Sequence, residues 1–515
     1  DVVRRERFSG GPARGFLSSL EADGRIFEAD LAVDRAHVVM LAEQGIVDDD
    51  SAGEILGALD EVEAAGHAAL PEGEDVHAAI ETAVVDRVGE VGGRMHTARS
   101  RNDEVATCLR YRLREDLLDT AERVLELREV LREVADEHSR TVMPGFTHLQ
   151  PAQPTTVGHY LLSYESALRR DTARLLDAYD RTNRSPLGAA AFAGTTFDVD
   201  RERTAELLGF DEVIENSMDA ASARDFLVES TAAVASIATG LSGVAEDLVI
   251  FSNRGLVELD DDYASTSSIM PQKVNPDTME LARATAGDAA AGLNGLLTTL
   301  KGLPRAYNRD LQRAHGHAFE AVDAVAEATE VVAGAVATAT WPEEALAAAA
   351  GEGFSTATGV ADLLAASGVP FRTAHEMVAH AAQRAAERTS SAERSSADRS
   401  SGQCPREDGG AASRAAESVE TGGAADYAAL DAAAREVLGD SLDAHVDAAA
   451  VEAALDPAES VAARDSFGGP APGAVAGALD RAAESCETDA EALADRRETL
   501  ADAADRLARE VSRHV

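Results

Sequence analysis

The chain has 515 residues, of which 47 are basic and 92 are acidic, and its formal net charge is −45. Such a charge repels itself in the compact state unless salt screens it, and at molar salt the screening length is only about 3 Å. Because the acids are spread over the whole length and aromatic residues make up only 4%, the composition predicts adaptation to a very salty cytoplasm. Nucleic acid and anionic membranes are disfavoured as partners, since both bind positive patches.

The cysteines and the apolar runs narrow the class of protein further. Cys108, Cys404 and Cys486 lie far apart, so neither a disulfide scaffold nor a structural zinc site is predicted. No apolar run approaches the roughly 20 residues that span a membrane, and the charged segment Asp1–Glu6 lacks the apolar region of a signal peptide. We therefore expect a cytoplasmic protein that does not bind membranes.

Helical periodicity runs through most of the chain and predicts an all-α fold. Apolar residues recur at helical spacing for roughly 30 residues after Asn102. Further long helices are expected after Pro154 and over about 222–252, 276–300 and 314–340. Apolar stripes of this length need partners on several sides, so the helices are expected to form a central bundle that is shared between subunits.

Composition divides the chain into three expected domains. These are an N-terminal helical domain (1–105), a central bundle (106–350) and a C-terminal helical domain (351–515). Residues 379–418 contain no Leu, Ile, Val, Phe or Met and cannot bury enough apolar surface to offset the entropy of ordering. A disordered insertion is therefore predicted at about 379–424.

Only two lysines remain among 47 basic residues, Lys273 and Lys301. An ammonium is a compact charge that fits a tight pocket, whereas a guanidinium is a wide planar fork. Lys273 lies two residues before Asn275 in the polar segment Ser267–Pro276, which therefore resembles a mobile anion-binding loop. Exposed backbone N–H groups near Ser267 could form an oxyanion-type pocket there. For Lys301 a site role and a plain surface role are equally expected.

Two other connecting segments carry groups suited to chemistry. In Pro144–Pro154, prolines hold His148 in a defined backbone, and a histidine can titrate near neutral pH. In Gly93–Asp103, three arginines and a histidine precede a helix start, which is typical of a carboxylate-binding element. The pair His315 and His317 does not predict a metal site, because residues two apart face different sides of a helix.

Together these segments resemble the aspartase/fumarase superfamily, whose members cleave C–N or C–O bonds and release fumarate. Within it the chain is most similar to the argininosuccinate lyase branch. The resemblance spans nearly the whole chain apart from the predicted insertion. It is carried by residues 96–103, 144–153, 216–219, 224–226, 267–275, 307–312 and 369–375.

The resemblance implies a three-domain fumarase/aspartase-like fold, a homotetramer whose active sites are shared between subunits, and no cofactor or metal. It further implies reversible elimination of fumarate from argininosuccinate, a small molecule, to give arginine. Ser267 as alkoxide would remove the Cβ proton, Lys273 and Asn275 would stabilise the resulting aci-carboxylate, and His148, oriented by Glu280, would shuttle protons. The implied substrate-binding residues are Ser19, His96, Arg101, Asn102, Thr147, Arg224, Gln272, Tyr307, Gln312 and His315.

The chain also departs from the pattern of this branch. Thr266 and Ala98 replace glycines, Val274 replaces a lysine and Glu104 a glutamine, while His315 stands where a lysine is usual. The alternatives that remain are a fumarase, an adenylosuccinate lyase, or a structural homologue that has lost the chemistry.

Overall fold

The structure, a computed structural model, describes residues 12–400 and 425–515. Helices make up nearly all of its regular structure, and the strands in these ranges form three small two-stranded sheets. The prediction of an all-α fold is confirmed.

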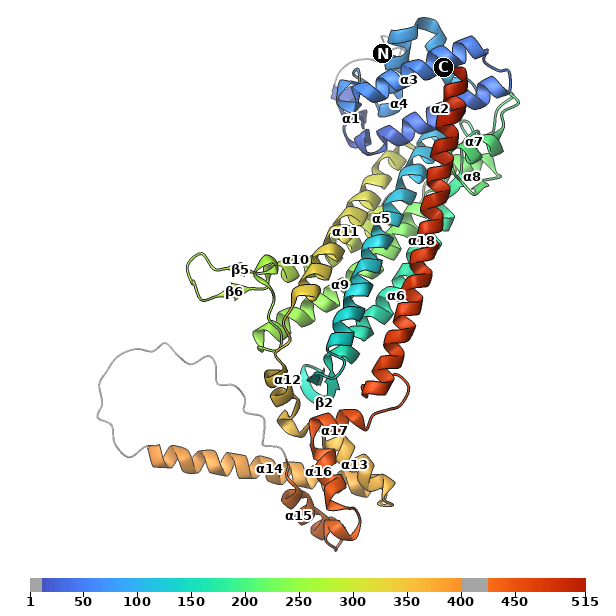
Figure 1. Cartoon of the computed structure of the whole chain (residues 1–515). Helices are drawn as coiled ribbons and strands as arrows, with labels where there is room; N and C mark the ends of the chain where they lie inside the picture. Colours follow the sequence, from blue (N-terminus) through green and yellow to red (C-terminus); the bar gives the residue numbers. More distant parts are fainter. Residues whose placement is uncertain (1–11, 401–424) are drawn as a thin grey trace.

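Long helices form the centre of the molecule (Figure 1). Of these, α9 packs against α6, α10 and α11, while α5 packs against α6 and α11. Their positions confirm the helices predicted from periodicity, with ends shifted by a few residues. The bounds are α5 (Arg101–Glu137), α6 (Val157–Thr182), α9 (Asp225–Asn253), α10 (Asp277–Leu300) and α11 (Ala314–Thr338).

The N-terminal elements cover one end of this bundle (Figure 1). Their apolar residues join the bundle residues in one continuous core. The elements are α1 (Pro12–Leu17), η2 (Ala22–Ile26), α2 (Phe27–Glu43), α3 (Asp49–Ala65), η3 (His67–Ala69), α4 (Val76–Val88) and η4 (Gly89–His96).

The start of α5 is fixed by a capping box. The Ser100 hydroxyl accepts a hydrogen bond from the Asn102 N–H at 3.3 Å, and Asp103 accepts one from the Ser100 N–H at 3.0 Å. The second Asp103 oxygen accepts the N–H groups of Gly188 and Ala190 at 3.0 and 2.8 Å. One buried carboxylate therefore joins the helix start to a connecting segment more than 80 residues later in the chain.

Short elements occupy the connections. Between α6 and α9 lie β3 (Arg184–Ser185), α7 (Arg201–Leu207), β4 (Glu212–Val213) and α8 (Ser217–Ser222), with β3 and β4 paired in parallel. Between α9 and α11 lie η5 (Asp261–Tyr263), β5 (Ser265–Thr266), β6 (Val274–Asn275) and η6 (Arg309–Arg313). The β1 (Val142–Thr147) and β2 (Gln150–Thr156) strands connect α5 to α6.

A further long helix, α18 (Pro472–His514), runs back along the bundle beside α5 and α6 (Figure 1). The fully buried Arg128 of α5 joins the three helices. It donates to Glu165 of α6 at 3.1 Å and to Asp489 of α18 at 2.6 Å. Arg128 also donates to Ser485 of α18 at 3.0 Å. Apolar residues of α18 belong to the same core as the N-terminal helices.

A second apolar core lies beyond the other end of the bundle and is built from residues between Phe354 and Val451. Its elements and their neighbours are α12 (Glu343–Ala350), η7 (Glu352–Phe354), α13 (Ala357–Ala366), α14 (Phe371–Ser400), α15 (Tyr427–Val437), η8 (Leu442–Ala444), α16 (Ala448–Leu455) and α17 (Pro457–Ala462).

The predicted disordered insertion is helical over its first part, because α14 continues to Ser400. Met377, Ala381 and Ala385 are buried in the second core, and α14 continues past them through residues that are richest in serine, alanine and arginine. A helix that has already formed extends more readily than a new one starts. The absence of large apolar residues was thus a poor guide to local structure here. The rest of the predicted insertion, 401–424, lies outside the described residues.

The expectation that no apolar run is long enough to span a membrane does not hold for one helix. By length and composition α9 could do so, since an 18-residue window has a mean hydropathy of 1.5. However, α9 packs against α6, α10 and α11, and a core helix of a bundle meets the same criteria.

Candidate active site

The predicted site residues fall into three groups, which lie apart in one chain. His148 and Thr147 are on the β1–β2 hairpin at one end of the bundle, and the β5–β6 hairpin projects from its side (Figure 1). The remaining binding residues gather at the N-terminal end.

His148 occupies the tip of the β1–β2 hairpin. Thr147 pairs with Gln150, so His148 and Leu149 alone form the turn, with φ angles of 57° and 58°. Positive φ at both positions is the pattern of a type I′ hairpin turn, which usually contains asparagine or glycine. At His148 the chain therefore accepts an unfavourable backbone conformation, which presents the exposed ring beyond the hairpin.

Arg254, which follows α9 directly, holds this turn in place. Its Nη2 donates to the Leu149 carbonyl oxygen at 3.2 Å, and its Cζ lies 4.7 Å from the centre of the Phe146 ring. Arg254 and His148 line one cavity of about 510 Å³, together with Tyr160 and Asp247. No sequence pattern indicates this arginine, because only the folded chain brings it to the hairpin.

Replacing Arg254 by alanine is expected to lower kcat about fivefold, because one hydrogen bond worth about 1 kcal/mol no longer holds the His148 turn. Steady-state kinetics would measure the change, with Arg435→Ala as control, since Arg435 forms an exposed ion pair with Asp431 on α15. Equal kcat values for the two variants would contradict a role for Arg254 in positioning His148.

The loop between β5 and β6 arranges its polar groups around Ser267. The Ser267 N–H donates to the Lys273 carbonyl oxygen at 3.0 Å, which closes the loop. The Ser267 hydroxyl oxygen accepts the N–H groups of Ile269 at 3.4 Å and Met270 at 3.1 Å. Two donors aimed at this oxygen would stabilise negative charge on it, as in an oxyanion pocket.

The other predicted groups of this loop lie beside Ser267 in sequence and are mostly exposed. The Lys273 ammonium donates to the Asn275 side-chain oxygen. Gln272 is exposed, and so is Glu280 on the first turns of α10. Ile269 is 83% exposed and Val274 58%, which is unusual for apolar side chains. Within one chain Glu280 lies on α10, which follows this loop, and not on the His148 hairpin.

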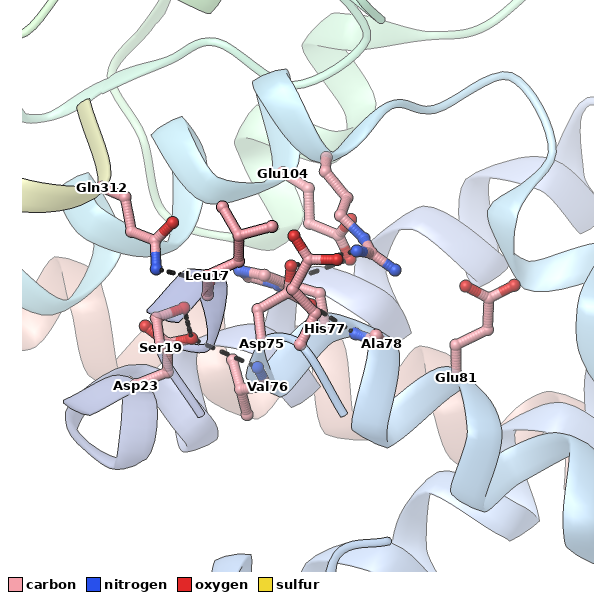
Figure 2. A network of polar contacts seen from close by, with 12 residues as sticks. Leu17, Ser19, Asp23, Asp75, Val76, His77, Ala78, Glu81, Glu104 and Gln312 are labelled. Atoms are coloured by element: carbon pink, nitrogen blue, oxygen red, sulfur yellow. Dashed lines mark hydrogen bonds and ion pairs between the residues drawn. The ribbon is translucent and has the colours of Figure 1, made fainter. Parts of the chain in front are cut away.

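At the N-terminal end Gln312 lies next to Ser19, because it contacts Leu17, two residues earlier in the chain (Figure 2). The Ser19 hydroxyl donates to Asp23 at 2.7 Å, and its N–H donates to the Glu74 carbonyl oxygen at 2.8 Å. Gln312 donates from Nε2 to the Leu17 carbonyl oxygen at 3.0 Å. Residues almost 300 positions apart in sequence are thereby brought together.

The segment before α5 lies next to this group. Arg101 forms an ion pair with Asp75 at 3.0 Å, and Asn102 donates from Nδ2 to the Ala191 carbonyl oxygen at 2.9 Å. Burial lowers the pKa of His96 to about 4, and the neighbouring Arg99 and Arg101 add to the effect. The His96 ring is therefore neutral near pH 7.

Arg224 lies near Tyr307 and His315, and both Arg224 and His315 have buried nitrogens without a hydrogen-bond partner in the described residues. Arg224 is 3% exposed, and its Nε and Nη2 have no hydrogen-bond partner in the described part of the chain. Burial lowers its pKa to about 10, with Tyr307 acting in the opposite direction. Burial also lowers the pKa of His315 to about 4, and Arg224 contributes. A buried guanidinium with free donors is suited to a carboxylate ligand.

Several acidic residues at this end were not predicted as site residues. Asp75 caps α4 through one oxygen and pairs with Arg101 through the other, while Asp23 holds Ser19. The sequence signal was present, because Glu74, Asp75 and His77 place charge at a helix start. Without the fold, however, an acidic stretch in so acidic a chain indicates nothing specific.

The matches to known families and proteins fit this site. A family model described as "Lyase" matches residues 16–290, and one described as "Argininosuccinate lyase C-terminal" matches 354–462. The argininosuccinate lyase of Natronomonas pharaonis is 70% identical over 99% of this chain and 96% of its own length. That of Haloarcula marismortui is 64% identical over 100% of this chain and 96% of its own length. Both are halophilic archaea, in agreement with the acidic composition.

A solved structure agrees with this result. The EDDS lyase in complex with formate has a TM-score of 0.82 and 32% sequence identity, and the match covers 100% of this chain and 98% of that one. The helical bundle, the polar loops and these matches define a lyase of the fumarase/aspartase superfamily. Within that superfamily the chain belongs to the argininosuccinate lyase family.

Proposed function

We propose that the three groups of polar residues carry out the reaction of an argininosuccinate lyase, the reversible elimination of fumarate from argininosuccinate to give arginine. The observation that carries the proposal is the Ser267 hydroxyl oxygen, which accepts two backbone N–H groups in the loop that also holds Lys273. A hydroxyl is a weak base, and these donors make its alkoxide accessible.

In the proposed reaction the Ser267 alkoxide removes the Cβ proton beside a substrate carboxylate. The charge that develops on this carboxylate is stabilised by Lys273 and Asn275, and this interaction strengthens only along the reaction path. The C–N bond then breaks, and its electron pair leaves with the guanidinium nitrogen, which must receive a proton. His148, which is exposed at its turn and lines a cavity, acts in that transfer.

The N-terminal groups bind the substrate in this proposal. Arg224, Tyr307 and His315 receive a carboxylate, because the Arg224 guanidinium has free donors and His315 is neutral. A neutral His315 offers a hydrogen bond where a lysine would add a charge. The other proposed substrate contacts are Ser19, His96, Arg101, Asn102, Thr147, Gln272 and Gln312.

Because the three groups lie apart in one chain, the active site is proposed to form between subunits of a homotetramer. Exposed apolar residues on the projecting loop and on α10, such as Ile269 and Leu281, support this assembly. In the assembly, Glu280 of one subunit orients His148 of another. The enzyme is proposed to work in a salty cytoplasm, without a metal or cofactor.

Incubation with argininosuccinate in molar KCl tests the function directly. We expect fumarate, followed by its ultraviolet absorbance, together with an equal amount of arginine, and no turnover of malate or adenylosuccinate in parallel. Turnover of malate or adenylosuccinate without turnover of argininosuccinate would contradict the proposal. Size-exclusion chromatography with light scattering in the same salt measures the tetramer.

A further inference from the structure

The segment Thr97–Asn102 lies on a group of buried charges that the proposed reaction does not use. Each of these side chains is no more than 2% exposed. They come from α2, from α4, from the segment itself and from the first turn of α5 (Figure 2 shows His77 and Glu104). We define this buried charge cluster as Asp30, Asp34, His77, Arg99 and Glu104.

Three contacts fix the segment to this cluster and to α2. Arg99 places Nη1 2.6 Å from Asp34 and Nη2 2.9 Å from Glu104. His37 donates from Nε2 to the Thr97 carbonyl oxygen at 2.8 Å, and burial lowers the pKa of His37 to about 3, so its ring is neutral. Arg99 and His37 therefore hold the backbone that carries His96 and Arg101 against the buried charge cluster and α2.

The cluster contains more acids than cations. Asp30, Asp34 and Glu104 each place an oxygen within 4.8 Å of the other two. The cations are Arg99 and His77, whose Nδ1 lies 2.8 Å from Asp30 and 3.7 Å from Glu104. An uncompensated charge in the interior is strongly unfavourable and is avoided by protonation. One of the three carboxyls therefore keeps a proton.

The surroundings of each group indicate where this proton resides. Burial alone would lower the pKa of His77, but Asp30 and Glu104 raise it to about 10, so the ring is a cation near pH 7. Burial alone would raise the pKa of Asp30, but His77, Arg99 and a hydrogen bond from Cys108 together lower it. Burial raises the pKa of Asp34 to about 7 against the opposing effect of Arg99, and it raises the pKa of Glu104 to about 8 against Arg99 and His77. Arg99 lies closer to Asp34, at 2.6 Å, than to Glu104, at 2.9 Å, so the shared proton resides on Glu104.

We propose that Glu104 is a positioning residue, which as the neutral acid of the buried charge cluster allows Arg99 to hold the Thr97–Asn102 segment in the conformation that receives substrate. This inference rests on the proposed function, in which His96, Arg101 and Asn102 contact the substrate. When Glu104 ionises, its carboxylate competes with Asp34 for Arg99, or water enters the cluster to solvate the extra charge. The segment then loses its fixed position.

Stability has a defined pH dependence in this proposal. The folded-state pKa of Glu104 lies above the ordinary value of 4.5, so the unfolded chain ionises first. The unfolding free energy therefore falls as pH rises from about 4.5 to about 8, and the contribution is flat above that range. A neutral side chain of the same shape removes this decline.

Glu104→Gln and Asp34→Asn test the charge count independently, because each leaves two carboxyls for two cations. The matched control is Glu63→Gln, which removes an exposed carboxylate paired with Arg35. Between about pH 7 and about pH 8.5, KM for argininosuccinate is expected to rise about fourfold in wild type and control, as Glu104 ionises, and to change far less in both variants. The Tm of the control should fall over the same range more than that of either variant.

The outcomes separate this inference from the proposed function. KM ratios in both variants equal to that of the control would overturn the positioning role. The double variant leaves one carboxyl for two cations, so a Tm no lower than those of the single variants would also contradict the charge count. If His96→Ala left KM unchanged, the proposed substrate site itself would fail, and the positioning role with it, while the Tm profiles would still report whether Glu104 carries the proton.

Discussion

Replacing Ser267 by alanine is expected to lower kcat at least about 100-fold, because a general base is typically worth 10²–10⁴ in rate. The hydroxyl is removed, and the N–H groups of Ile269 and Met270 remain without a charge to stabilise. Since Ser267 lies on a loop outside the bundle and the apolar Ile269 is kept, folding and assembly should be unaffected. The rate of fumarate release in molar salt measures the effect, and circular dichroism checks the fold.

The adjacent Ser268 provides a matched control, because it is exposed in the same loop. Ser268→Ala should retain most of the wild-type rate. A mild effect of Ser267→Ala, within about tenfold of wild type, would remove Ser267 from the role of base, since that loss is below the range for general-base catalysis.

Lys273→Arg is expected to reduce kcat about 100-fold or more, although it keeps the charge, because loss of one stabilising contact to a developing oxyanion typically costs that much. The Lys273 ammonium donates to the Asn275 side-chain oxygen within a loop closed by the Ser267–Lys273 backbone hydrogen bond. A guanidinium is planar and wide, and cannot place one donor at the same point. KM should change less than kcat, because the contact strengthens in the transition state.

Lys301→Arg is the natural control, since it changes the only other lysine of the chain. Lys301 is exposed at the end of α10, so its replacement should leave the kinetics unaltered. A Lys273→Arg enzyme as active as Lys301→Arg would contradict the view that this site needs an ammonium.

The long helices could be predicted because apolar spacing over several turns is a strong signal. The segments at residues 93–103, 144–154 and 260–277 were predicted as site loops from their polar and basic residues, and the structure places them largely between the long helices. Their role in the site stays a prediction. The two-residue turn at His148 and Leu149 could not be predicted, because leucine rarely adopts positive φ and the pair lacks the asparagine or glycine usual in such turns.

The buried charges were the other part that the sequence could not predict. In a chain of net charge −45, Asp34 and Glu104 look like two more solvated acids. Only the packing of α2, α4 and α5 places them around Arg99. Similarly, the serine-rich residues at the end of α14 indicated disorder by composition, although they continue a helix whose earlier turns are packed in the second core.

The path of α18 constrains how the chain folds during synthesis. This helix leaves the ribosome after every element that it packs against, and its last turn lies on α3, where His514 approaches Asp49 at 3.5 Å and its carbonyl oxygen leaves room only for glycine at position 53. Translation proceeds at about 5–20 residues per second, so the nascent N-terminal helices remain uncovered for tens of seconds. During that interval Arg128 has no Asp489 to pair with. A chaperone that shields the surface later covered by α18 would therefore favour productive folding more than one that acts after release.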